Sequence, residues 1–245
     1  MPRPRVHDLD RLLDATERLA VESGPAAVTV RAISELTSVS NGAIYNAFGS
    51  RAGLVGRVWL RAARRFLAVQ QDMVQAARAS ALKPSHEPDP GSTAAVGAGA
   101  VVDAAIEAVV AAADAPARFL TERPASGRFL LAVSRTELLG SSDLPDDLAT
   151  ELEGLDRELA ALFVALSSDL WGRADRACVE LVRDCVVELP TALLLRGRRD
   201  PETPARQRIA ACVRAVLALG PPLDARGPAA PAGPPDFIDR EDHHQ

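Results

Sequence analysis

The sequence has few aromatic residues, almost no lysine and little cysteine. Phe, Trp and Tyr together number nine among 245 residues, which disfavours a β-sandwich or β-barrel because strands are rich in aromatic and β-branched side chains. Alanine, leucine, arginine and glutamate recur instead, and these are strong helix formers. With 47% hydrophobic residues, the chain is able to bury a sizeable core. The composition therefore predicts an all-α fold.

Long apolar runs are also missing. The sequence has no stretch of roughly 18 uncharged apolar residues, the length that a membrane-spanning helix needs. Its first residues, MPRPRVHDLDRLL, lack the apolar centre of a signal peptide. We therefore expect a cytoplasmic protein that has no membrane partner.

Cysteine and histidine are too few and too scattered for a metal site. The three cysteines, Cys178, Cys185 and Cys212, form no C-x-x-C pair and have no histidine at ligand spacing. They are expected to be small buried side chains. No glycine-rich phosphate loop, H-E-x-x-H or G-x-S-x-G motif is present. We therefore expect neither a metal, nor a cofactor, nor a catalytic site.

The charge is divided unevenly along the chain. Residues 1–65 contain ten arginines and six acidic residues, a net charge of +4, although the whole chain carries −5. The remainder is therefore acidic, with a net charge of −9. Such asymmetry indicates that the N-terminal segment meets a polyanion.

Periodic apolar residues predict a set of short helices followed by longer ones. The expected helices are about 7–22, a short one that follows Thr29 and ends near Leu36, 41–47, and a long one from Ser50 to about residue 79. A loop is expected over 83–99, and five helices over 100–219, with a break at Pro116 and a kink at Pro190. The Pro- and Gly-rich stretch from Gly220 onward is expected to be a disordered tail.

The second and third expected helices have the spacing of a helix-turn-helix unit. A helix that enters the major groove of DNA needs small or hydrogen-bonding residues at its start and an apolar inward face. Residues 40–43, Ser-Asn-Gly-Ala, meet the first need, while Ile44 and Phe48 meet the second. Tyr45 and Asn46 would then point outward, toward phosphate oxygens or base edges. A plain surface turn between two packed helices remains the alternative.

Residues 12–55 resemble the N-terminal domain of the TetR family of transcriptional repressors. The resemblance lies in 22–24 (Glu-Ser-Gly), 29–30 (Thr-Val), 39–45 (Val-Ser-Asn-Gly-Ala-Ile-Tyr) and 48–54 (Phe-Gly-Ser-Arg-Ala-Gly-Leu). It implies a helix-turn-helix head joined by a long helix to a helical body that dimerises and takes a small-molecule effector. The implied domains are 1–50 for DNA binding and 51–219 for effector binding and dimerisation, with 220–245 as the tail.

The resemblance also assigns roles within the head. It implies that Thr29, Tyr45 and Arg51 hold phosphates of double-stranded DNA, and that the bases are approached from the start of the third helix. The full set of implied DNA-binding residues is Thr29, Ser38, Ser40, Asn41, Gly42, Ala43, Tyr45, Asn46 and Arg51. Ser38 stands where the family usually has glycine, and it tolerates a positive φ less well. Ala47 stands where a His or Tyr is common, which removes one phosphate contact.

Two helices near the end of the body carry wide apolar faces, which suggests a second copy as partner. Pairing two copies would form a four-helix interface and would place two heads about 34 Å apart, one turn of DNA. The residues expected in this interface are Val179, Val182, Val186, Leu189, Leu193, Ile209, Val213 and Val216. The alternative is that both helices lie inside the core of one subunit.

A pocket for the effector is expected among aromatic and apolar residues of the body. Its expected lining is Phe66, Phe119, Phe129, Val133 and Phe163, although such side chains are more often plain core. The chain would then be a repressor that binds a palindromic operator as a homodimer and is released by the effector, through the long fourth helix. A helical adaptor that has kept the head and lost DNA binding is the alternative function.

Overall fold

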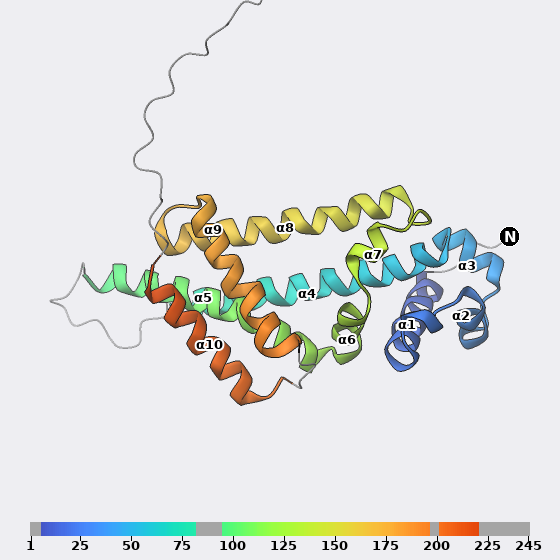
Figure 1. The fold of residues 1–245 in the computed structure, drawn as a ribbon, viewed down its shortest axis with the longest axis horizontal. Coiled ribbons are helices and arrows are strands. Elements are labelled where there is room, and N and C mark those ends of the chain that lie inside the picture. The colour runs from blue at the N-terminus through green and yellow to red at the C-terminus, as the bar shows by residue number, and fades with distance from the viewer. Residues whose placement is uncertain (1–5, 82–94, 197–200, 221–245) are drawn as a thin grey trace, which may run out of the picture.

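The computed structural model describes residues 6–81, 95–196 and 201–220, and every regular element in these ranges is helical. The molecule is elongated, with three helices clustered at one end and the others forming a body along its length (Figure 1). The predicted all-α fold is confirmed. No helix in the described ranges is long and apolar enough to cross a membrane.

The N-terminal helices, which we call the head, begin where capping residues predict. They are α1 (Val6–Ser23), the 3-10 turn η1 (Pro25–Ala27), α2 (Val30–Thr37) and α3 (Asn41–Phe48). The Thr29 hydroxyl accepts a hydrogen bond from the Ala32 amide at 3.1 Å, and the Ser40 hydroxyl accepts one from the Ala43 amide at 3.3 Å. Each bond satisfies a backbone donor that the first helical turn leaves free. The expected short helices are therefore present.

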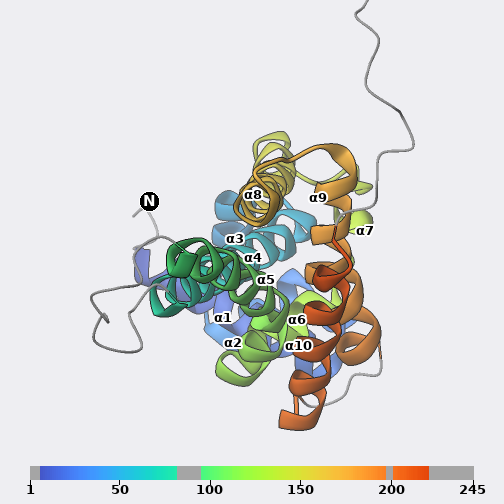
Figure 2. The ribbon, with the colours of Figure 1, turned by 90° about the vertical axis from the view of Figure 1, so that its left-hand side faces the viewer.

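Five more helices complete the centre of the molecule. They are α4 (Arg51–Ala81), α5 (Ala95–Glu122), α6 (Pro124–Ala132), α7 (Arg135–Leu139) and α8 (Asp146–Trp171). The long helix α4 runs from the head into the body, where it packs against α5 and α8 (Figures 1 and 2). The expected loop over 83–99 falls mostly outside the described residues, but its end is wrong, because α5 begins at Ala95.

Pro116 lies inside α5, where the sequence predicts a break. Because proline has no N–H, the carbonyl of Ala112 has no donor four residues later in its own helix. Nε2 of Gln70 on α4 donates to this carbonyl at 3.1 Å. The neighbouring helix thus supplies the missing hydrogen bond, and α5 continues past Pro116 to Glu122.

The C-terminal part of the body is helical on both sides of Pro190. It comprises α9 (Arg176–Arg183), the π-helical stretches η2 (Asp184–Glu188) and η3 (Thr191–Leu195), and α10 (Thr203–Ala218). Around the expected kink the helix winds more widely, and the Leu189 amide bonds the carbonyl of Asp184, five residues earlier. π winding shifts the register of backbone bonds and so accommodates the donor that Pro190 lacks. The described part of 100–219 holds six α-helices rather than the expected five.

The head shares its core with elements that lie far along the chain. Its buried cluster is Leu12, Ala20, Val28, Val30, Ile33, Ile44, Phe48, Leu54, Val55, Val58, Phe129, Val133 and Leu138. These residues come from α1–α3, the first two turns of α4, and the stretch from α6 to α7. The expected domain boundary at residue 50 therefore cuts through one continuous core. The expected tail lies outside the described residues, apart from Gly220.

Candidate nucleic-acid interface

The turn between α2 and α3 is closed by a residue in the left-handed conformation. Ser38 has φ 60° and ψ 21°, and its amide donates to the carbonyl of Ser34 at 2.8 Å. Among the described residues it is the one non-glycine position with positive φ. This conformation ends α2 and sets the direction in which α3 leaves. A serine side chain here costs about 1 kcal/mol relative to an unstrained residue.

Helix α3 has one buried face and one exposed face. Ile44 is 0% exposed and Phe48 is 8% exposed, so these two side chains fix α3 on the head core. The side chains of Asn41, Tyr45 and Asn46 are exposed and make no hydrogen bond within the described chain. Their amide and phenol groups are able to donate to phosphate oxygens or to pair with base edges in a groove.

The other expected DNA-binding residues surround this face. Gly42 is exposed and Ala43 is half-buried, so the start of α3 is narrow enough to approach another molecule closely. Thr29 and Ser40 are exposed at the starts of α2 and α3, where their hydroxyls are already used as helix caps. The structure thus brings eight of the nine expected residues together on the α2–turn–α3 unit. Ala47, beside them, is also exposed.

Arg51, the ninth expected residue, has a structural role that the sequence did not suggest. Its Nη2 donates to the carbonyl of Pro25 at 2.6 Å, and its Nε donates to the carbonyl of Val28. The guanidinium therefore ties the start of α4 to the segment between α1 and α2. Two of its five N–H donors are used in this way.

Arg31, on the exposed side of α2, is paired within its own helix. Its Nε lies 2.9 Å from Oε1 of Glu35, one helical turn later. The hydrogen bond to Glu35 raises the pKa of Arg31. Both side chains are largely exposed, so this ion pair is weak and Arg31 is able to exchange its partner for a phosphate.

A buried carboxylate joins the head to α4 and α6. Glu17 on α1 is 5% exposed. Its Oε1 accepts a hydrogen bond from the Ser126 hydroxyl on α6 at 2.6 Å, and its Oε2 lies 3.0 Å from Nη2 of Arg61 on α4. Arg61 also pairs with Asp14 at 2.8 Å. We call Glu17, Arg61 and Ser126 the buried joint, because together they fix the orientation of α1 against two body helices.

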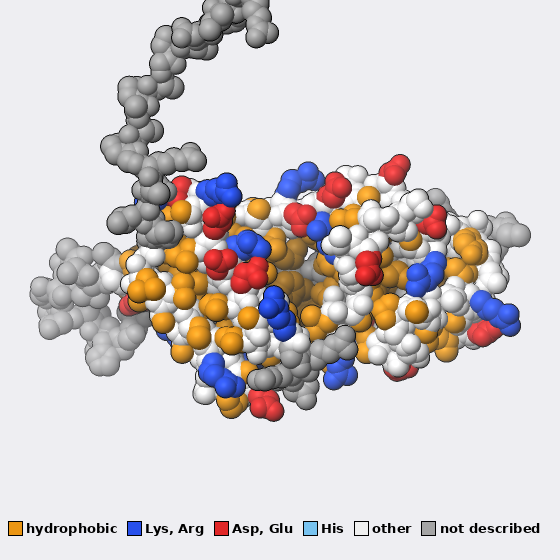
Figure 3. Space-filling model, viewed as in Figure 1, with side chains coloured by type: hydrophobic (Ala, Val, Ile, Leu, Met, Phe, Trp, Pro, Cys, Tyr) orange, Lys and Arg blue, Asp and Glu red, His pale blue; other side chains and the backbone are white. Residues whose placement is uncertain are grey.

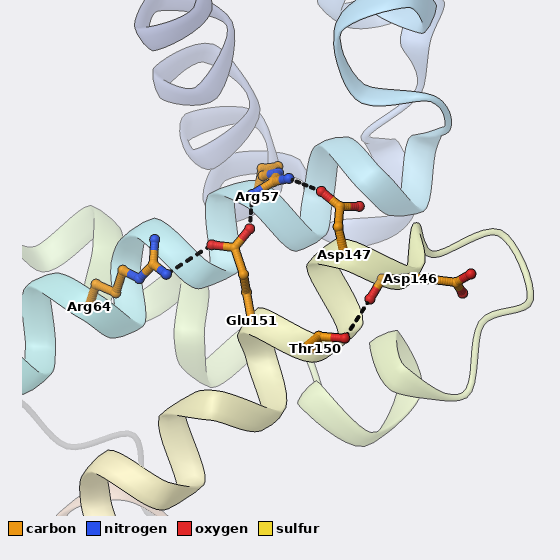
Figure 4. A network of polar contacts seen from close by, with 6 residues as sticks. All are labelled: Arg57, Arg64, Asp146, Asp147, Thr150 and Glu151. Atoms are coloured by element: carbon orange, nitrogen blue, oxygen red, sulfur yellow. Dashed lines mark hydrogen bonds and ion pairs between the residues drawn. The ribbon is translucent and has the colours of Figure 1, made fainter.

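A second, more exposed set of ion pairs joins α4 to α8 (Figure 4). Arg57 lies 2.6 Å from Asp147 and 2.5 Å from Glu151, and Arg64 lies 2.8 Å from Glu151. The hydrogen bond from Arg57 holds the pKa of Glu151 below its ordinary value. We call these four residues the outer joint. The buried joint links α4 to α1 and α6, whereas the outer joint links α4 to α8.

The residues expected to line an effector pocket are not gathered in one place. Phe66 and Phe119 stack edge to face with ring centres 5.6 Å apart, while Phe163 belongs to the main body core. Phe129 and Val133 lie instead in the head cluster, because α6 packs against α1. The five residues are therefore divided between the head cluster and the rest of the body.

An open surface pocket of about 390 Å³ lies elsewhere in the body, between α4, α5 and α10. Its lining comprises Met73, Ala77, Glu107, Val110, Ala111, Asp114, Thr203, Arg206, Gln207 and Ala210. Arg206 pairs with Asp114 through two contacts of 2.8 and 2.5 Å, and Arg214, farther along α10, pairs with Glu107 at 2.8 Å. These hydrogen bonds raise the pKa values of both arginines. The sequence offers one signal for this pairing, the similar spacing of the two acids on α5 and the two arginines on α10.

The eight residues expected at a dimer interface divide into two sets. Four are buried in the core of the single chain, namely Val182, Val186, Ile209 and Val213. Four are half-buried or exposed, namely Val179, Leu189, Leu193 and Val216. The helices α9 and α10 form a layer on one side of the α4–α5 pair (Figure 2). The first set therefore supports this layer from within, and only the second set is open to a partner.

The cysteines differ from one another in burial. Cys178 and Cys185 are buried as expected, whereas Cys212 is exposed on α10, contrary to expectation. Burial raises the pKa of the Cys185 thiol to about 11, which keeps it protonated and unreactive at neutral pH. No group of three or more metal-ligating side chains occurs in the described ranges.

Comparison with known proteins agrees with the head and with the fold as a whole. Residues 12–58 match the family model of bacterial regulatory proteins of the tetR family. A search of curated protein sequences found no match.

Solved structures are similar over most of the chain. The TetR family transcriptional regulator PfmR from Thermus thermophilus is 18% identical, with 85% of this chain and 98% of that chain covered and a TM-score of 0.53. A bacterial regulatory protein in the tetR family from Rhodococcus RHA1 is 18% identical, covers 90% and 100%, and has a TM-score of 0.56. A protein from Pseudomonas aeruginosa PAO1, proposed to be a transcriptional regulator, is 16% identical, covers 88% and 91%, and has a TM-score of 0.59. These similarities, all below 25% identity, show that the overall helical fold is shared.

Proposed function

We propose that this chain, whose residues 12–58 match the family model of bacterial regulatory proteins of the tetR family, is a DNA-binding transcriptional repressor that acts as a homodimer. The observation that carries the proposal is the outer face of α3. It presents Asn41, Tyr45 and Asn46 to solvent without a partner in the described chain. Such a face is suited to reading base edges in the major groove, while Thr29, Arg31 and Arg51 lie nearby for the phosphates.

The proposed homodimer uses the open side of the α9–α10 layer. Val179, Leu189, Leu193 and Val216 offer apolar surface there. Apolar side chains gather on this face in the space-filling view (Figure 3). Two copies joined through it would form a four-helix interface and a two-fold axis. The two heads would then fit a palindromic operator whose half-sites are about 34 Å apart.

The proposed regulation is release of the operator by a small-molecule effector. The effector would act by binding more tightly to a body conformation in which the two heads no longer match the half-sites. The buried joint and the outer joint both hold α4, so a shift of α6 or α8 would reach the head through Glu17 and Arg57. This function is regulatory rather than catalytic, needs no cofactor, and is exercised on cytoplasmic DNA.

Selection of bound genomic fragments by the purified full chain tests the proposal. We expect a small number of fragments with two-fold symmetric sequences, bound by a dimer in sedimentation experiments. The affinity should fall steeply with salt, because phosphate contacts release counterions. Binding of no fragment above background would contradict the proposal and would favour the helical adaptor.

A further inference from the structure

The side chains of α3 have one chemical property in common, which is that none of them is charged. From Asn41 to Phe48 the helix reads Asn-Gly-Ala-Ile-Tyr-Asn-Ala-Phe, and this range contains no Arg, Lys, Asp or Glu. Arginine and lysine are the side chains that most often pair with guanine in the major groove, and a carboxylate accepts a hydrogen bond from cytosine. The helix itself therefore lacks the groups that recognise a G·C pair through charge-assisted hydrogen bonds.

The arginines that lie nearest to α3 along the chain stand on other elements. Arg31 is on α2, with its Nε 2.9 Å from Oε1 of Glu35. Arg51 begins α4 and donates from Nη2 to the carbonyl of Pro25 at 2.6 Å. Both guanidinium groups are thus bound to groups of their own chain. Direct reading of bases by α3 must therefore use neutral groups.

The neutral groups that α3 offers are two amides and two methyl groups. The side-chain amides of Asn41 and Asn46 are exposed and make no hydrogen bond within the described chain. Ala43 is half-buried and Ala47 is exposed, and the two lie four residues apart, in one row of the helix. A side-chain amide pairs through two hydrogen bonds with N6 and N7 of adenine, and an alanine methyl packs against the C5 methyl of thymine. Both kinds of group favour A·T pairs.

Gly42 allows a base edge to approach α3 closely. A Cβ added at this position would meet no atom of the described chain within 4 Å, and its φ is not positive. Neither packing nor backbone conformation therefore requires glycine here, although glycine is unfavourable within a helix. Close approach of another molecule explains its presence. Asn46 lies four residues later in the same row, so a base edge above Gly42 would lie next to this amide.

We propose that the half-site read by α3 consists of A·T pairs, with adenines bound by Asn41 and Asn46 and with thymine methyls packed against Ala43 and Ala47. This inference rests on the DNA-binding function proposed above and specifies its target. Phosphate contacts hold a protein on DNA irrespective of sequence, so the choice of operator would rest on these neutral groups. Exchange of a contacted A·T pair for G·C should weaken binding about tenfold.

Selection from a random duplex library by the full chain, followed by affinity measurements with modified bases, tests the inference. We expect invariant A·T pairs in each enriched half-site. Replacement of an invariant adenine by 7-deazaadenine removes the N7 acceptor and keeps the base pair. At the adenine bound by each amide, this change should weaken the unmodified chain about fivefold. It should have no effect on the variant that lacks that amide, Asn41→Ala or Asn46→Ala.

The same experiment contains its control and separates the inference from the function beneath it. The 7-deazaadenine change in the spacer between the half-sites should leave the affinity unchanged, whereas uracil in place of a contacted thymine should weaken binding about threefold by removing one methyl group. Enriched half-sites whose invariant pairs are all G·C, or equal 7-deazaadenine effects in the unmodified chain and both variants, would overturn the inference and leave the proposed function intact. Enrichment of no sequence would overturn the proposed function, and the inference with it.

Discussion

The head and the body use their polar side chains in different ways. In the body, arginines of α4 and α10 pair with acids of α8 and α5, as in the outer joint and in the pairs of Arg206 and Arg214. On α3 of the head, the outward amides and phenol have no partner in the described chain. The body thus uses its charges to fix how helices pack, whereas the outward polar groups of α3 are left open to solvent. The contrast locates the proposed contact surface more sharply than net charge does.

The largest expected effect concerns the dependence of the head on the body. Phe129 on α6 is 0% exposed and lies in the head cluster. Phe129→Ala should lower the free energy of unfolding by about 3 to 5 kcal/mol and speed hydrogen exchange in α1–α3. Denaturant unfolding measures the first effect. Leu131→Ala, on the exposed side of the same helix, is the control, and an equal loss there would break the claim of a shared core.

The second largest loss of stability is expected when the buried joint is broken. Ser126→Ala removes a hydrogen bond to the buried Glu17 carboxylate, which should cost about 1 to 3 kcal/mol. Ser142, which is exposed and makes no hydrogen bond in the described chain, gives the control Ser142→Ala. Thermal unfolding compares the two variants. Indistinguishable transition temperatures would show that the joint contributes nothing to holding α1.

A substitution in the turn before α3 should raise stability, whereas the two substitutions above should lower it. Ser38→Gly removes the strain of a left-handed serine and should raise stability by about 0.5 to 1 kcal/mol. Ser34→Gly, inside α2, should lower stability by a similar amount, because glycine is unfavourable within a helix. Denaturant unfolding should therefore show a higher free energy of unfolding for Ser38→Gly and a lower one for Ser34→Gly. A destabilised Ser38→Gly chain would mean that the serine side chain has another role in the turn.

The smallest expected effect is in the outer joint. Glu151→Gln should cost about 0.5 to 1 kcal/mol at neutral pH, since the ion pairs are partly exposed. Because Arg57 lowers the pKa of Glu151 in the folded chain, its contribution is present at neutral pH and is lost as the pH falls through the folded pKa. The difference in the free energy of unfolding between the unmodified chain and Glu151→Gln should therefore disappear at acidic pH. Glu153→Gln, on the same helix without an ion pair, should show no such change.

The head was predictable from sequence because its signals are local. Thr29 and Ser40 act as caps a few residues before the amides that they bond, and the apolar spacing of Ile44 and Phe48 sets the buried face of α3. The region matched by the family model coincides with this local pattern. Its contacts with the rest of the chain were not predictable. Phe129 enters the head core from a distant helix.

Two features that the sequence did not predict depend on contacts between segments far apart in sequence. Pro116 stays within α5 because Gln70 of α4 supplies a donor, and Arg51 is drawn to the carbonyls of Pro25 and Val28. Periodicity gives the buried face of a helix, but it does not say which neighbour covers that face. The open pocket between α4, α5 and α10 has no phenylalanine in its lining, whereas the effector pocket was expected among phenylalanines.

The central claim is that the exposed face of α3 reads DNA, and the double variant Asn41→Ala/Asn46→Ala tests it most directly. The measurement is the affinity of the full chain for its most strongly selected genomic fragment, at one fixed salt concentration. We expect the double variant to bind at least about tenfold more weakly, with unchanged thermal stability, while Gln75→Ala on the far part of α4 binds as the unmodified chain does. Equal affinity of the double variant and the unmodified chain would contradict the account.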